Sequence, residues 1–88
     1  MKLKDRGMYV VERGERVGCF LIYIKEANIF ESYAFLCIPN PMEVLYLDKN
    51  DIKEGLRNGY MKFIEELPGD VYDVCAANFR WHAKKAGL

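Results

Sequence analysis

Two expected strands in the first half of the chain are apolar on both faces, and no other feature of the sequence constrains the fold as strongly. Successive side chains of a strand point to opposite faces of a sheet, so a strand with one solvated face alternates apolar and polar residues. The segments that break this alternation are 19–24 (CFLIYI) and 33–38 (YAFLCI). Both faces of their sheet need cover, because either face alone would expose a larger apolar patch than a monomeric protein tolerates.

The remaining patterns predict strands first and helices second. Turn signals separate four runs of β-branched and aromatic residues, which we expect to be strands at about 8–12, 17–26, 33–38 and 43–47. Apolar residues at three- and four-residue spacing then predict helices at about 49–67 and 70–86. The expected fold is a single α+β domain, in which a four-stranded antiparallel meander is followed by two helices packed on the sheet. A small curled β-barrel with C-terminal helices is the alternative.

The expected helices carry signals for where they begin and which side they bury. Asp48 and Asp70 are placed to act as N-caps, and Gly87 is placed to end the second helix. The side of the second helix that we expect to pack carries Val71, Val74, Cys75, Asn78, Phe79, His82 and Ala86. The polar residues within this set make the second helix less apolar than the first.

Three arrangements would cover both faces of the expected sheet: one helix on each face, a sheet curled into a barrel, or a second copy of the chain on the spare face. We favour the second copy and therefore expect a homodimer. The sheet residues expected at its interface are Cys19, Leu21, Tyr23 and Leu36. Ile29 and Phe30 are a second candidate contact, because they occupy a hairpin tip where polar residues are usual. The alternative for Phe30 is a ring folded back over the sheet edge.

Too few reactive side chains are present for most catalytic or metal sites. The chain has no threonine, no glutamine, one serine and one histidine. A hydroxyl nucleophile needs a base and an orienting group, and a structural zinc site needs about four cysteine or histidine ligands in short paired spacings. Cys19, Cys37, Cys75 and His82 are scattered, and no glycine-rich phosphate loop is present. We expect no enzymatic activity, no cofactor and no metal.

The charge balance argues against a nucleic-acid partner, although one segment supplies an alternative. Thirteen basic side chains equal thirteen acidic ones, whereas proteins that bind phosphates of nucleic acids usually carry a basic excess. The segment that combines cations with an aromatic ring comprises Arg80, Trp81, Lys84 and Lys85. These residues could bind phosphates and stack on a base. The same cations also complement the dipole at the end of a helix, which is the simpler interpretation.

Cysteine usage and hydropathy predict the compartment. Three cysteines without framework spacing indicate reduced thiols. The longest apolar run, 17–24, is far shorter than the roughly 20 residues of a membrane helix, and no secretion signal follows the charged segment 1–7. We expect a cytoplasmic protein without a membrane partner. The sequence thus predicts a non-enzymatic protein-interaction or assembly domain, with a nucleic-acid-binding accessory protein as the alternative.

Overall fold

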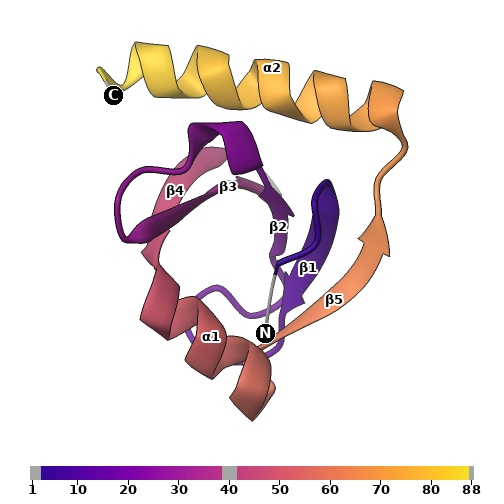
Figure 1. Ribbon diagram of the computed structural model, residues 1–88, viewed down its shortest axis with the longest axis vertical. Helices are drawn as coiled ribbons and strands as arrows, with labels where there is room; N and C mark the ends of the chain where they lie inside the picture. The colour runs from indigo at the N-terminus through magenta and orange to yellow at the C-terminus, as the bar shows by residue number, and fades with distance from the viewer. Residues whose placement is uncertain (1–2, 39–41, 88) are drawn as a thin grey trace.

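The computed structural model describes residues 3–38 and 42–87, and over this part of the chain it has five strands and two α-helices (Figure 1). The strands are β1 (Gly7–Val11), β2 (Phe20–Tyr23), β3 (Ser32–Ile38), β4 (Glu43–Asp48) and β5 (Met61–Glu66). The helices are α1 (Lys49–Asn58) and α2 (Gly69–Lys85), and a 3-10 helix, η1 (Lys25–Ala27), follows β2. The strands form one antiparallel sheet in the order β4-β3-β2-β1-β5. The expected α+β class is confirmed, but the alternative of a barrel is wrong because the curved sheet does not close.

The helix expected at 49–67 is wrong beyond residue 58, where the chain turns and becomes a strand. Gly59 ends α1 with a φ of 77°, the left-handed conformation in which helices commonly stop. The chain then runs antiparallel to β1, beginning with Met61 opposite Val11. Residues 61–66 therefore add a fifth strand, β5, to the expected four-stranded meander, at the edge beside β1.

The strand expected at 17–26 is also too long, because it is confined to β2. A turn with Gly18 at a φ of 88° precedes β2, and η1 follows it. The other expected strands, and the helix expected at 70–86, agree with β1, β3, β4 and α2 to within one residue at each end.

The expected caps are right at two of three positions. The Asp48 carboxylate accepts hydrogen bonds from the backbone N–H groups of Asn50 (2.8 Å) and Asp51 (3.3 Å), as an N-cap of α1 does. Gly87 follows α2 with a φ of 79°. Asp70 lies inside the first turn of α2 rather than before it, because that helix already begins at Gly69.

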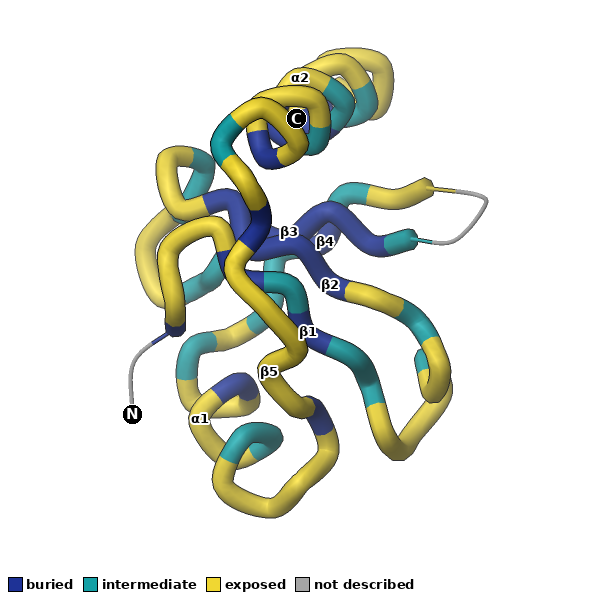
Figure 2. The backbone as a smooth tube through the Cα atoms, turned by 90° about the vertical axis from the view of Figure 1, so that its right-hand side faces the viewer, coloured by how far each residue is buried: buried dark blue, intermediate teal, exposed yellow. Residues whose placement is uncertain are grey.

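Each helix covers one face of the sheet, which was the first of the three arrangements considered above. In Figure 1, α1 lies at the open side of the curved sheet and α2 crosses the opposite face. Figure 2 shows that α2 turns its buried residues toward the sheet and its exposed residues away from it. Because each face is covered by a helix of the same chain, the sheet needs no second copy to bury its apolar residues.

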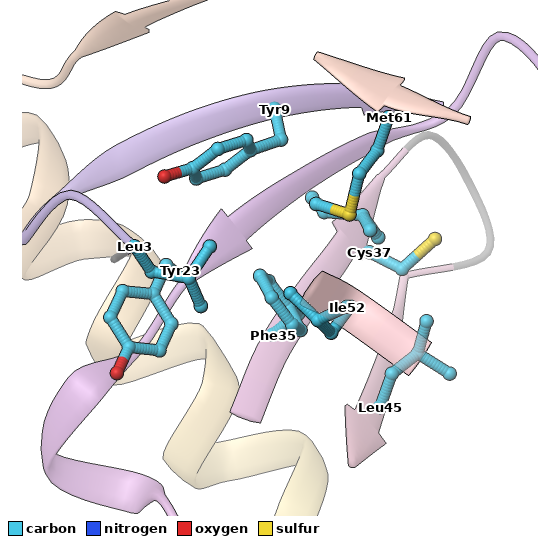
Figure 3. Packing of buried hydrophobic residues seen from close by; sticks show 9 residues of the cluster. Leu3, Tyr9, Tyr23, Phe35, Cys37, Leu45, Ile52 and Met61 are labelled. Carbon is cyan, nitrogen blue, oxygen red and sulfur yellow. The ribbon is translucent and has the colours of Figure 1, made fainter. Parts of the chain in front are cut away.

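Two clusters of buried residues correspond to the two faces. The concave cluster, under α1, comprises Leu3, Tyr9, Leu21, Tyr23, Phe35, Cys37, Leu45, Ile52 and Met61 (Figure 3). The α2-side cluster comprises Ile22, Ile24, Ala34, Leu36, Leu67, Tyr72, Ala76, Phe79 and Ala83. Adjacent residues of β2 and β3 belong to different clusters, as expected for strands that are apolar on both faces. Neither α1 nor α2 is long and apolar enough to cross a membrane.

Gly55 lies inside α1, where glycine lowers helix stability. A Cβ atom at this position would lie 3.6 Å from Met61 Cγ, which is an ordinary van der Waals contact. We expect Gly55→Ala to raise the free energy of unfolding by about 0.5–1 kcal/mol. Urea denaturation measures the change.

Gly59→Ala is the matched control, because it places a Cβ at a left-handed position. We expect it to lower the free energy of unfolding by about 1–2 kcal/mol. Equal losses of stability in the two variants would contradict the assignment of Gly59, rather than Gly55, as the end of α1.

Candidate functional site

Three of the sheet residues expected at an interface lie in the core. Leu21 and Tyr23 belong to the concave cluster under α1, whereas Leu36 belongs to the α2-side cluster. All three are at most 4% exposed, so no partner can reach them in the folded chain. Their assignment to an interface is therefore wrong, because the two helices cover one face each. Cys19 is half-buried beside the concave cluster.

Helix α2 exposes three large apolar side chains on its outer side. Val74 is 61% exposed and Trp81 56% exposed, and Val71 is exposed as well. The side of α2 that packs on the sheet instead carries Tyr72, Ala76, Phe79 and Ala83. The expectation that Val71 and Val74 face the core is therefore wrong. Helix α2 has apolar residues on two sides, and it buries the side that does not carry Val71 and Val74.

Four exposed residues of α2 and the half-buried Asn78 follow one another along the helix and are here called the outer stripe: Val71, Val74, Asn78, Trp81 and Lys85. Their spacing of three and four residues keeps them on one face of the helix. The Asn78 side chain donates a hydrogen bond from Nδ2 to the Val74 carbonyl oxygen at 2.9 Å. A shallow groove runs between Val74 and Trp81, with Asn78 between them. The outer stripe thus has apolar side chains on both sides of a central amide, and it ends in Lys85.

The charges along α2 are separated by sign. Asp70 and Asp73 lie at its beginning, whereas Arg80, Lys84 and Lys85 lie at its end. This order complements the helix dipole within the chain itself. It also gives the outer stripe an acidic end and a basic end.

The residues of the nucleic-acid alternative do not form one surface. Lys85 Nζ lies 4.7 Å from the centroid of the Trp81 ring, so a cation of the same chain already contacts the face on which a base would stack. Arg80 and Trp81 are consecutive in α2 and point about 100° apart. The geometry brings Trp81 together with Lys85 and leaves Arg80 on another side of the helix.

The hairpin tip at Phe30 is exposed, as the sequence analysis expected. Phe30 is 97% exposed and has a φ of 34°, a backbone conformation that only glycine and asparagine adopt readily. The backbone N–H of Ser32 donates to the Ile29 carbonyl at 2.7 Å and closes the turn. Asn28 holds the turn in place, because its side chain bonds both the Tyr23 hydroxyl and the backbone N–H of Ala34. The ring does not fold back over the sheet.

The titratable groups in the core are held in their neutral forms. Burial, with a contribution from neighbouring Cys19, raises the pKa of the Cys37 thiol to about 11, and burial also raises the pKa of the Cys75 thiol. Thiols with raised pKa values are poor nucleophiles near neutral pH. Burial and a 2.6 Å hydrogen bond to Glu26 raise the pKa of the Tyr72 hydroxyl. Over residues 3–38 and 42–87, no three histidine, cysteine or acidic side chains gather as a metal site.

Comparison with protein-family models, with curated proteins and with solved structures finds no match for this chain. A function therefore has to be inferred from the two exposed apolar features described above, the outer stripe of α2 and the tip at Phe30. The spacing of Val71, Val74, Asn78 and Trp81 was recognised in the sequence, but it was assigned to the packed side of the helix, whereas Val71, Val74 and Trp81 are exposed.

The conformation of Phe30 gives a prediction about stability. Since its ring is exposed and its backbone is left-handed, Phe30→Asn removes strain and no packing. We expect the free energy of unfolding to rise by about 1 kcal/mol, as measured by urea denaturation. A fall of similar size would mean that the ring packs against the protein in solution. Phe35→Ala is the contrast, and should cost about 3–5 kcal/mol because Phe35 is fully buried.

Proposed function

We propose that the protein is a non-enzymatic assembly module that forms a homodimer through the outer stripe of α2. The observation that carries the proposal is that Val71, Val74 and Trp81 stay exposed while α2 already buries its other side on the sheet. A helix with a second apolar face gains stability by burying it against another surface. Exposed aromatic and aliphatic residues in one row are the usual core of a helix-mediated interface.

The charge order along α2 supports a second copy, in antiparallel orientation, as the occupant. When two such helices run in opposite directions, the acidic beginning of one (Asp70, Asp73) faces the basic end of the other (Lys84, Lys85). In a parallel pair, the like charges would meet and repel each other. The helix dipoles also oppose each other favourably in the antiparallel pair. The surface of α2 is thus complementary to itself.

Asn78 supports the same orientation, because it lies close to the middle of α2 (Gly69–Lys85). In an antiparallel pair, the two Asn78 side chains would lie near the two-fold axis. Its Nδ2 already donates to Val74 O, and an amide has a second N–H and a carbonyl oxygen for a partner amide. A polar residue in an otherwise apolar seam favours the one alignment in which it is paired.

The size of this surface predicts a dimer that dissociates on dilution. A helix of 17 residues is about 25 Å long. One helix pair of this length buries less than the roughly 1,200–2,000 Å² of a stable interface. The mass in solution should therefore rise with concentration toward twice 10.3 kDa.

Val74→Glu tests the proposal, because it places a charge at the most exposed valine of the outer stripe. We expect this variant to remain at the monomer mass across a tenfold range of concentration in light scattering, while the parent chain dimerises. Val17→Glu is the matched control, since Val17 is 60% exposed but lies in the turn between β1 and β2. This control should dimerise like the parent chain.

Two outcomes would contradict the proposal. One is a parent chain that stays monomeric at all concentrations. The other is a dimer whose affinity falls equally with Val17→Glu and Val74→Glu. The antiparallel orientation is tested separately by salt, which should weaken the dimer between about 50 and 200 mM because the facing charges attract. A dimer strengthened by salt would indicate a parallel pair.

A further inference from the structure

A cavity of about 300 Å³ opens beside the concave cluster, between the turn that joins β1 to β2, helix α1 and the first residues of β5. Its floor is apolar and includes Leu21, Ile52 and Met61. Figure 3 shows Met61 extending into this cluster from β5 and Ile52 extending into it from α1. Two arginines, Arg13 and Arg16, lie at the rim. An apolar floor with a few charged groups at the mouth is the usual composition of a small-molecule site.

We propose that this cavity binds a monocarboxylate with an unbranched aliphatic body, of the medium-chain fatty acid class. The chain would lie against Leu21, Ile52 and Met61, and the carboxylate would be held at the mouth by Arg16. This site is separate from the outer stripe of α2, so the inference does not depend on the proposed dimer.

Arg16 supplies the observation that points to an anion. Its Nε is buried and has no hydrogen-bond partner among residues 3–38 and 42–87. Its only ion pair within the same residues is with Glu43, at a long 3.7 Å. The Nε–H is closed to water and to ligands alike, but the side chain as a whole is 40% exposed. A carboxylate would therefore bind the exposed Nη end of the guanidinium, which the long ion pair with Glu43 leaves weakly satisfied. Arg13 lies beside it with its guanidinium 5.2 Å from the Tyr60 ring centroid, and adds a second positive charge.

The acidic residues at the rim restrict the ligand to a single negative charge. Asp51 lies in the first turn of α1, where the helix dipole compensates a carboxylate. Glu15 has no such compensation and repels an incoming anion. A dianion such as a phosphate monoester would be repelled twice as strongly. Because Glu15 and Asp51 already offset the two arginines, a single carboxylate bound by one arginine fits this rim better than a dianion.

The size and lining of the cavity restrict the body of the ligand. A volume of about 300 Å³ is at the lower end of small-molecule sites, so it can enclose a short aliphatic chain but not the whole of a long-chain lipid. The floor residues have no hydrogen-bonding side chains, so a body with hydroxyl or amide groups would lose its bonds to water without replacement. An aliphatic chain meets both conditions.

Octanoate is the probe, titrated into isotope-labelled protein and followed by the NMR signals of the side-chain methyl groups. We expect saturable shifts at Leu21, Ile52 and Met61. Affinity should rise about fourfold for each methylene from butanoate through hexanoate to octanoate. Octanol, which lacks the charge, should bind at least fivefold more weakly, and Arg16→Gln should weaken octanoate about tenfold. Absence of shifts at these methyls with millimolar octanoate, or equal binding of octanol and octanoate, would overturn the proposal.

Two further variants keep the test independent of folding and of dimerisation. Gly55 lines the cavity, and its position accepts a Cβ at ordinary contact distance, so Gly55→Leu should fill the cavity and abolish binding. Should that variant unfold, Glu15→Gln provides the second test, and must strengthen octanoate binding about twofold by removing the repulsive charge. Unchanged or weaker binding by Glu15→Gln would contradict a carboxylate at this rim. Val74→Glu should bind octanoate like the parent chain.

Discussion

The arrangement of the whole chain depends on a sheet whose central strands have no hydrophilic face. In β2 and β3, neighbouring pairs alternate between the two clusters: Leu21 pairs with Cys37 on the concave side, and Ile22 pairs with Leu36 on the side of α2. Burial of the apolar side chains on each face, away from water, contributes most of the favourable free energy of folding that a domain of this size can gain. The sheet is therefore stable only when both of its faces are covered.

The path of the chain after β4 solves this requirement within one copy. Helix α1 leaves β4 at one edge of the sheet, crosses the concave side and delivers the chain to β5 at the opposite edge (Figure 1). After β5, helix α2 begins on the opposite face of the sheet and crosses that face back toward the edge at β4. The cavity beneath α1 and the outer stripe of α2 are consequences of this path. Helix α1 crosses the concave side of the sheet without filling it, which leaves the cavity. Helix α2 packs on the opposite face and leaves the apolar residues of its outer stripe exposed to solvent.

The features of the fold that could be predicted are those that depend on neighbouring residues in the sequence. The apolar faces of β2 and β3, the Asp48 cap and the α+β class are local patterns, and all were predicted. The strand β5 was missed because Ile52, Leu56, Tyr60 and Phe63 also fit a helical spacing. The local signal against a helix was Asn58-Gly59, a usual helix end. Tyr9 and Phe63 contact each other through the fold, which a local pattern cannot reveal.

The packed side of α2 was mispredicted for a related reason. In α2, one set of apolar residues (Tyr72, Ala76, Phe79, Ala83) and another (Val71, Val74, Trp81) both have helical spacing. Sequence spacing identifies the two sides but does not say which one meets the sheet. That choice is made by the shape of the opposite face, where the Phe79 ring packs edge-on against Tyr46.

The most direct test of this account is a single nuclear Overhauser spectrum of the aromatic rings. We expect cross-peaks between Tyr9 and Phe63, whose ring centroids lie 5.6 Å apart, and between Tyr46 and Phe79, whose ring centroids lie 6.0 Å apart. The first contact requires β5 beside β1, and the second requires α2 on the opposite face. Absence of the Tyr9–Phe63 cross-peak, together with helical chemical shifts for residues 61–66, would contradict the account.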